Sequence, residues 1–421
     1  MIERSETVRR AQTGLLAAAA VVLVGMIVAY PGEAFAASMS GLTVWWEIVF
    51  PALLPFFMLS ELLLGFGVVH ALGVLLEPLM RVLFRVPGVG GWALAAGFAA
   101  GFPGGAKAAA DLRRDGLVSR AEGERLLAVS HIASPIFLTV VVAVGFLGRP
   151  ELGLPLTAVH LVSALVTGLI VCRLPSRDAA EPAAEPPADD RGGRPGTGPL
   201  LAMAEARRRD GRPLGRLLGD AVASAVQSLL VIGGLMIVFS VLLRLLGLLG
   251  VADAIRSVAQ LALTPFGLPG ALADASAAAL LEVHLGAYTV AQAGGASVWA
   301  AALLAAVVGW GGLSAHAQVK SLVGGTDLRY APFLRARLVH AAVSVLVAFA
   351  LWEPLLRWFG GVSPTFAAAP GAGVAAAGLG AHGLWPHMPA MAQALAAFAL
   401  AAAVLSSVAA ALRGAARLRR R

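Results

Sequence analysis

The chain has 421 residues, of which 58% are hydrophobic and 13% are charged. A soluble domain carries about twice that share of charged residues, so the composition excludes a soluble enzyme, a disordered protein and a nucleic-acid binder. The net charge of +8 comes from short basic segments beside apolar spans, as in the cytoplasmic loops of membrane proteins. The sequence therefore predicts an all-α polytopic membrane protein. A single cysteine, Cys172, excludes a disulfide framework and a cysteine-built zinc site.

The first half of the chain is expected to hold several membrane-embedded helices. An apolar run of about 20 residues is long enough to span a bilayer. The run 13–30 follows three arginines, so we interpret it as a retained helix with a cytoplasmic N-terminus. After it we predict a span at 42–66, an amphipathic piece at 70–86, a short Gly-rich piece at 89–103, a polar stretch at 111–125, and apolar runs at 126–148 and 153–173.

A change of composition separates the two halves. Residues 175–213 are rich in proline and alanine, which predicts a flexible linker, and Arg207–Arg209 indicate that it is cytoplasmic. An amphipathic stretch at 214–226 follows. We then predict apolar helices at 227–250, 254–269, 276–291, 296–313 and 333–356, and a last helix at 388–412 before a basic, cytoplasmic tail.

The two halves follow a similar order of full spans and short, interrupted pieces. With the N-terminus inside, 42–66 runs inward and 227–250 runs outward, which predicts two inverted repeats with broken or re-entrant helices. The expected organisation is an N-terminal helix and lead-in (1–41), a first repeat (42–174), the linker (175–213), a second repeat (214–356), and a Gly/Ala-rich outer segment with the final helix and tail (357–421).

Two glycine clusters interrupt the apolar matrix, and each is followed by one of the two lysines in the chain. In the first, Gly101–Gly105 precede Lys107. The free N–H groups of a helix that starts there would favour an anion, although Lys107 is also spaced to pair with Asp111 at i,i+4. In the second, Gly309–Gly312 precede Ser314, His316 and Lys320. His316 and Lys320 are four residues apart and share a helical face.

Ionisable residues inside apolar runs mark a third candidate region. Glu282 and His284 lie within 276–291, where a charge is costly unless it faces a wet cavity. Glu61 is a candidate counter-ion or coupling residue, or a helix-end residue. His131 and Ser134, before Pro135, either face the cavity or bond a neighbouring helix. Glu282, His284 and His316 are residue types that can bind a metal, but nothing in the sequence fixes their geometry, and we predict neither a metal nor another cofactor.

The candidate substrate-binding residues are Gly101, Pro103, Gly104, Gly105, Lys107, Ser134, Glu282, His284, Ser314, His316, Gln318 and Lys320. Glu61 and Glu282 are the candidate coupling residues. The sequence contains no hydrolase, zinc-protease or nucleotide-binding loop motif that would indicate an enzyme.

At these residues the chain resembles the YlbJ family of sporulation integral membrane proteins. That family is part of the wider group with nucleoside-recognition or Gate repeats. The resemblance is carried by FPALLPFF (50–57), GFPGGAKAAADL (101–112), SRAEGERLL (119–127), SHIASPIF (130–137), LLEVHLGA (280–287) and GLSAHAQVKS (312–321), with Arg337 and His340 beyond them. The chain departs from the family in its linker, its C-terminal segment and the polar LLEVHLG stretch.

The resemblance implies a multi-pass protein of the outer forespore membrane or cell membrane that passes dipicolinate, a small aromatic dianion, toward the spore. Lys107 and Lys320 would then attract the two carboxylates. Two alternatives stay open: a structural membrane protein for spore-envelope assembly, and a nucleoside-type permease. The expected partners are the anionic solute and the lipid bilayer, without nucleic acid. A second copy of the chain or other sporulation membrane proteins are candidate partners.

Overall fold

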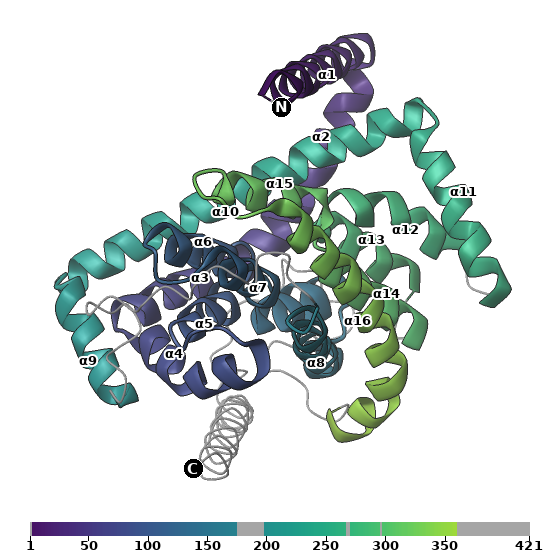
Figure 1. The fold of residues 1–421 in the computed structure, drawn as a ribbon. Helices are drawn as coiled ribbons and strands as arrows, with labels where there is room; N and C mark the ends of the chain where they lie inside the picture. Colours follow the sequence, from purple (N-terminus) through teal and green to yellow (C-terminus); the bar gives the residue numbers. More distant parts are fainter. Residues whose placement is uncertain (1, 175–197, 267–269, 295–296, 360–421) are drawn as a thin grey trace.

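A computed structural model describes residues 2–174, 198–266, 270–294 and 297–359, and every regular element in these ranges is a helix (Figure 1). This confirms the all-α prediction. Five helical stretches in the described residues are long and apolar enough to cross a membrane: Pro31–Gly65, Pro150–Val171, Leu214–Leu248, Val298–Val323 and Tyr330–Phe359. The chain is a multi-pass integral membrane protein.

The first half contains many short helical elements beside the longer α1 and α8. They are α1 (Ile2–Ala29), α2 (Pro31–Val44), η1 (Trp45–Val49), α3 (Phe50–Gly65), α4 (Val68–Leu79), η2 (Met80–Phe84), α5 (Gly90–Ala100), α6 (Gly104–Arg114), α7 (Arg120–Ser130), η3 (Phe137–Phe146), η4 (Pro150–Leu152) and α8 (Gly153–Val171). The apolar run 126–148 is divided in two, because α7 ends at Ser130 and Pro135 starts a new helical segment. Proline disfavours helical backbone in the residue before it.

The second half contains the longest helices. They are α9 (Pro199–Asp210), α10 (Leu214–Leu248), α11 (Val251–Leu263), η5 (Thr264–Phe266), α12 (Gly270–Leu281), α13 (Val283–Gly294), α14 (Val298–Trp310), α15 (Gly312–Val323) and α16 (Tyr330–Phe359). The predicted pieces 214–226 and 227–250 form one helix, because no proline interrupts them. The predicted run 276–291 is instead broken at Glu282.

Two predicted segments need separate mention. Residues 199–210 of the predicted linker form α9, which packs on α4, so this part of the segment is helical rather than flexible. The Pro199 ring suits the first helical turn, since the missing N–H would have no partner there. The outer segment, the final helix at 388–412 and the basic tail lie outside the described residues.

The two halves share one apolar core. Helix α16 packs on α14 of its own half and on α8 of the other. The largest core cluster accordingly joins Phe137 and Val142 to Leu272 and Trp352. Burial of apolar surface stabilises the fold by about 25 cal/mol per Å², and here it stabilises the contact between the halves. The inverted relation of the two predicted repeats stays a prediction.

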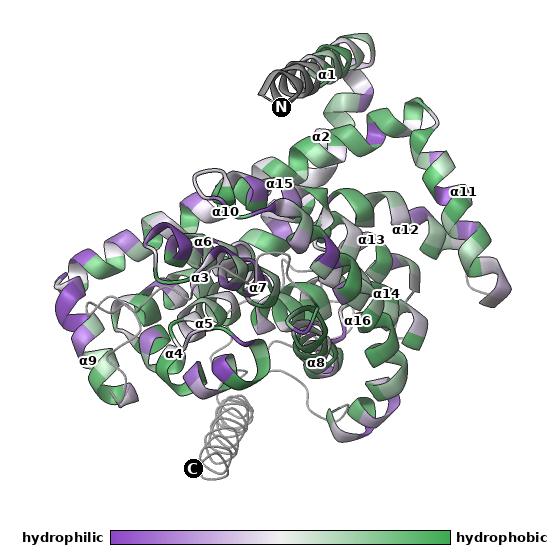
Figure 2. Ribbon diagram, viewed as in Figure 1, coloured by the Kyte–Doolittle hydropathy of each residue, from purple (hydrophilic) through white to green (hydrophobic). Residues whose placement is uncertain are grey.

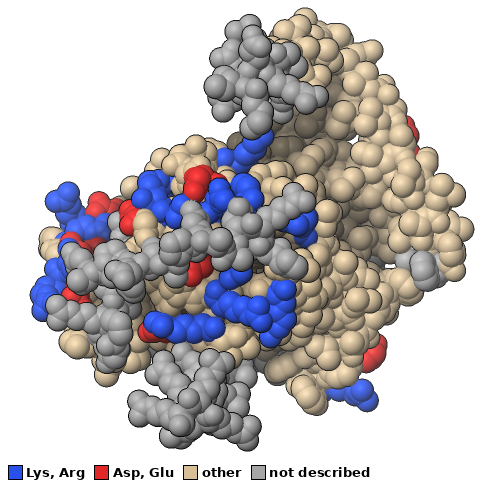
Figure 3. Space-filling view, in the orientation of Figure 1, with Lys and Arg blue, Asp and Glu red and all other residues tan. Residues whose placement is uncertain are grey.

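Charged side chains gather on one side of the molecule. Polar residues are concentrated around α6, α7 and α9, whereas the region of α12–α14 is mostly apolar (Figure 2). In the space-filling view, Lys, Arg, Asp and Glu gather on the side of α6, α7 and α9, and few charged residues show on the right-hand side of the same face (Figure 3). An uncharged surface of this kind suits contact with lipid tails.

Candidate functional site: a cavity between four helix breaks

Glycines with left-handed backbone make two of the helix breaks. Helix α5 ends at Gly101, whose φ is 68°, and α6 begins after a cis Phe102–Pro103 peptide bond. Helix α14 ends at Gly311, with φ of 87°, and Gly312 follows with φ of 74°. Positive φ is costly for residues with a Cβ, so these glycines allow each helix to stop and restart inside the protein.

Polar residues occupy the other two breaks. Helix α12 stops at Leu281 and α13 starts at Val283, with Glu282 between them. Residues 131–134 separate α7 from the next helical segment, where Ser134 Oγ accepts a hydrogen bond from Phe137 N at 3.3 Å. A serine in this position satisfies one of the free N–H groups of the new helix start.

The four breaks pack against each other in pairs. A Cβ on Gly101 would come within 3.0 Å of Ser134 N, and a Cβ on Gly312 within 2.8 Å of Val283 N. Only glycine allows backbone segments to approach so closely. Each glycine break therefore packs against one polar break: Gly101 against residues 131–134, and Gly312 against the break at Glu282.

The paired breaks surround a cavity of about 30 Å³. It has room for about two water molecules, whereas sites for organic ligands usually measure about 300–1,000 Å³. A solute can therefore enter only if the walls move apart. The lining residues are Leu53, Phe57, Ala100, Gly101, Phe102, Ser134, Phe137, Ile232, Glu282, Val283, His284, Ser314, Ala315 and Gln318.

Glu282 dominates the polar chemistry of the cavity. Its side chain is 3% exposed, and its Oε1 lies 2.7 Å from His284 Nδ1. Leu285 N donates to Oε2 at 2.8 Å, and Ser314 Oγ donates to Oε1 at 3.5 Å. A buried carboxylate needs such partners to offset its lost hydration. The pair presents hydrogen-bonding groups to a polar solute.

Half of the predicted substrate-binding residues meet at this cavity. Gly101, Ser134, Glu282, His284, Ser314 and Gln318 all line it. Pro103, Gly104 and Gly105 form the start of α6 beside it. Gly105 serves packing, because Ser130 Oγ donates to its carbonyl at 3.0 Å and a Cβ there would overlap Ser130 O.

The two predicted lysines lie elsewhere. The Lys107 side chain is 67% exposed and pairs with Asp111 at 3.2 Å. Lys320 is exposed on α15 and is not among the lining residues. Neither ammonium contacts the cavity, and their predicted roles in binding remain predictions.

His316 and Glu61 have other partners. His316 Nδ1 lies 2.7 Å from Tyr330 Oη, and its Nε2 lies 3.1 Å from Trp310 O. Glu61 accepts a hydrogen bond from Ser224 Oγ at 2.9 Å. In the part of the chain that the structure describes, no three His, Cys, Asp or Glu side chains converge as metal ligands.

Two features of the site were missed by reasoning from the sequence. Gly97, Gly101 and Gly105 recur every four residues and pack on 130–134, a spacing that is visible in the sequence as a stripe of small residues. Arg337, 1% exposed, donates to the carbonyls of Ala128, in the last turn of α7, and His131, the first residue of the break. Its position in an apolar run was the available signal.

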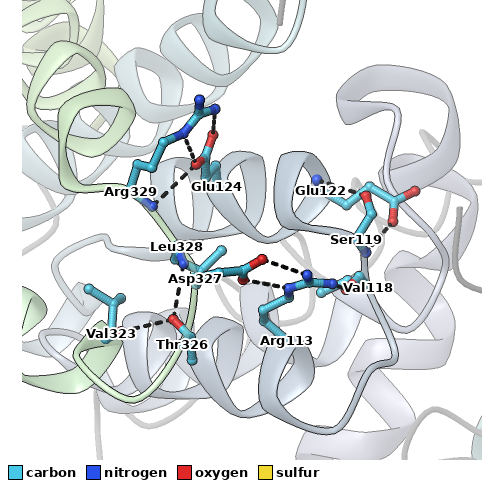
Figure 4. Close-up of polar contacts among 10 residues, drawn as sticks. All are labelled: Arg113, Val118, Ser119, Glu122, Glu124, Val323, Thr326, Asp327, Leu328 and Arg329. Carbon is cyan, nitrogen blue, oxygen red and sulfur yellow. Dashed lines mark hydrogen bonds and ion pairs between the residues drawn. The ribbon is translucent and has the colours of Figure 1, made fainter. Parts of the chain in front are cut away.

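Two ion pairs join the halves: one links the end of α6 to the turn after α15, and the other links α7 to the residue before α16 (Figure 4). Arg113 contacts Asp327 at 2.8 and 2.7 Å. Arg329 contacts Glu124 at 2.7 and 2.8 Å. Both are two-point contacts, which fix orientation as well as distance. We call these four residues the ion-pair clasp.

Comparison with known proteins gives the family. A family model described as "Nucleoside recognition" (Gate) matches residues 46–150, the segment that supplies the first glycine break and Ser134. The sporulation integral membrane protein YlbJ of Bacillus subtilis (strain 168) is 39% identical over 343 residues, which cover 82% of this chain and 83% of that protein. No solved structure matches. The chain therefore belongs to the family of sporulation integral membrane protein YlbJ.

Proposed function

We propose that the chain is a membrane carrier for a small polar solute during sporulation, and that the cavity between the four helix breaks is its solute site. The observation that carries the proposal is the buried Glu282–His284 pair in a cavity built from broken helices. Broken helices around a central polar site are typical of secondary transporters. The relative's description as a sporulation protein supports the biological setting.

Dipicolinate is the first solute that we propose. No lysine or arginine is among the residues that line the cavity, so a dianion would meet Glu282 without a cation from the wall. Protons can supply the missing charge. With Glu282 ionised and His284 neutral the pair carries −1, and binding two protons changes this to +1. We therefore propose that the dianion moves together with protons.

A nucleoside is the second candidate solute. The remaining polar lining residues, Ser134, Ser314 and Gln318, are neutral and offer hydrogen bonds. The matched family model is described as nucleoside recognition. A neutral solute of this kind needs no added proton for charge balance.

Uptake into vesicles tests the proposal. The purified full chain is reconstituted into proteoliposomes, and uptake of labelled dipicolinate is compared with that of empty liposomes, with and without an acidic exterior. We expect saturable uptake that an acidic exterior accelerates. Inhibition by excess nucleoside, with nucleoside uptake in its place, would favour the second solute. No uptake of either from folded protein would contradict a carrier and favour a structural role in spore-envelope assembly.

A further inference from the structure

A polar cluster lies behind the cavity wall, between α7, α8 and α16. Its members are His131, His160, Arg337 and His340, and each is at most 1% exposed. Arg337 Nη1 lies 3.1 Å from His340 Nδ1, and the rings of His160 and His340 are 5.0 Å apart. None of the four lines the cavity. The solute site as proposed therefore leaves this cluster without a role.

The guanidinium of Arg337 is buried without an acidic partner among the described residues. Its hydrogen bonds go to carbonyl groups and to His340, and the Phe333 ring lies 5.5 Å away. A buried cation of this kind is costly unless dipoles or hydrogen bonds replace its hydration. Its partners must therefore explain why an arginine is found here.

The partners are the carbonyls at the end of α7. Arg337 Nη2 donates to Ala128 O at 2.5 Å, and Nη1 donates to His131 O at 2.8 Å. The last carbonyls of a helix lack partners within it and carry a partial negative charge. Arg337 supplies both hydrogen-bond donors and a positive charge to these carbonyls, since it bridges the last turn of α7 and the first residue of the break.

The same break forms part of the cavity wall. Ala133 N donates to His160 Nε2 at 3.0 Å, which holds the middle of the break. Ser134, the next residue, lines the cavity and packs against Gly101. A continuous set of contacts thus runs from Arg337 on α16, in the second half, to the Ser134–Gly101 wall in the first half.

We propose that Arg337 is a positioning residue. It fixes residues 131–134 from α16 and so holds Ser134 and Gly101 at the cavity, without touching the solute itself. Because Arg337 and the break belong to different halves, the wall is tied to the position of α16. The importance of this wall for transport rests on the proposed function; the positioning itself does not.

Hydrogen exchange of the full chain in detergent micelles tests the positioning directly. The amides of Ile132, Ala133 and Phe137 are all hydrogen-bonded in the break, so the peptide covering 130–137 reports on it. We expect Arg337→Gln to speed exchange there about tenfold or more, as for loss of charge-assisted hydrogen bonds, with α10 unchanged. Arg335→Gln, an exposed position on the same helix, is the matched control and should change nothing.

Arg337→Lys separates positioning from charge. An ammonium keeps the charge but lacks the planar fork that reaches two carbonyls. We expect it to leave exchange at 130–137 several times faster than in the wild type. Full rescue by lysine would overturn the proposal, and so would unchanged exchange in Arg337→Gln. Uniformly faster exchange or loss of both variants from the membrane would also overturn it, because Arg337 would then support the whole fold.

Uptake provides the second readout. In variants with local exchange changes only, we expect the KM for the solute to rise about fivefold or more, because a displaced wall weakens binding, while the amount of protein in the vesicles stays the same. An unchanged KM despite a loosened break would overturn the link to the cavity. Absence of uptake by the wild type would refute the proposed function, and exchange at 130–137 would still decide the positioning role.

Discussion

At the scale of single residues, Glu282 is the group on which the proposed coupling depends. It is the one acidic side chain among the described residues that line the cavity. Its partners, His284 and Leu285 N, hold it in the wall at 2.7 and 2.8 Å.

Replacement of this carboxylate should therefore remove the pH response. For Glu282→Gln we expect that an acidic exterior no longer accelerates uptake of the dianion. The uptake rate at acidic pH should be about tenfold lower than in the wild type, and the difference should be smaller at higher pH. Glu353→Gln is the control, because Glu353 is exposed on α16 and is not among the lining residues. Proteoliposome uptake between pH 5.5 and 8 measures both. An unchanged pH response in Glu282→Gln would contradict proton coupling at this residue.

The lysines give the opposite expectation. Lys107 is exposed and paired with Asp111 at 3.2 Å, and an exposed ion pair of this type contributes about 0.2–1 kcal/mol. We expect Lys107→Gln, Lys320→Gln and the double variant to keep uptake within about twofold of the wild type. A more than tenfold loss of uptake, at equal protein in the vesicles, would restore both lysines as solute-binding residues.

At the scale of elements, the breaks set the architecture of the site. Three of them could be predicted: the glycine clusters at 101–105 and 309–312, and the Pro135 signal at 130–134. The break at Glu282 could not, because the surrounding alanines and leucines favour an unbroken helix. Which break faces which depends on contacts between distant segments, such as Gly312 with Val283. Sequence periodicity carries no information about these pairings.

The glycine stripe yields a packing prediction. For Gly105→Ala the new Cβ would overlap the carbonyl oxygen of Ser130, which is itself fixed in the wall. Overpacking against backbone costs about 1–3 kcal/mol or more. We expect a lower melting temperature and reduced uptake. Gly234→Ala is the control, because a Cβ there meets nothing within 4 Å, and it should be neutral or stabilising. Equal thermal stability of both variants, by fluorescence-detected melting, would refute this packing.

At the scale of the whole molecule, the ion-pair clasp joins the halves on the charged side. Hydrogen bonding to Arg113 holds the pKa of Asp327 below its usual 3.8. Because the carboxyl pKa is lowered, the ion pair stabilises the folded protein at pH values above 3.8. This stabilisation is lost as the pH falls through the lowered pKa. We therefore expect the clasp to be insensitive to pH between 5 and 8. The protection factors of the amides of residues 324–329, which are corrected for the ordinary rise of exchange with pH, measure this. A marked step in them between pH 5 and 8 would contradict the expectation.

A charge exchange tests the clasp itself. Arg113→Asp places a carboxylate opposite Asp327, and Asp327→Arg places two guanidinium groups together. We expect either change alone to speed amide exchange at 324–329 several-fold, consistent with surface pairs of up to about 1 kcal/mol. The double variant should recover most of the protection. Failure of the double variant to recover would show that the pair does not hold the loop through its charges.

The fold as a whole was open to prediction only in part. Composition and run length identified the multi-pass helical class, because apolar helices of this length have no other stable environment. The joining of both halves into one core, through α16 on α8, was not predictable, since many helices present similar apolar faces. Arg337 was visible in the sequence, but its role depends on the distant α7 carbonyls that it reaches.

The most direct test of the carrier proposal is a reversible block of the cavity. Because Cys172 is the only cysteine, Cys172→Ser gives a clean background in which Gln318→Cys places a thiol at the cavity and Ala317→Cys, its exposed neighbour, is the control. A water-soluble methanethiosulfonate should stop uptake in Gln318→Cys only, and dithiothreitol should restore it. Full uptake by quantitatively labelled Gln318→Cys protein would contradict passage of the solute through this cavity.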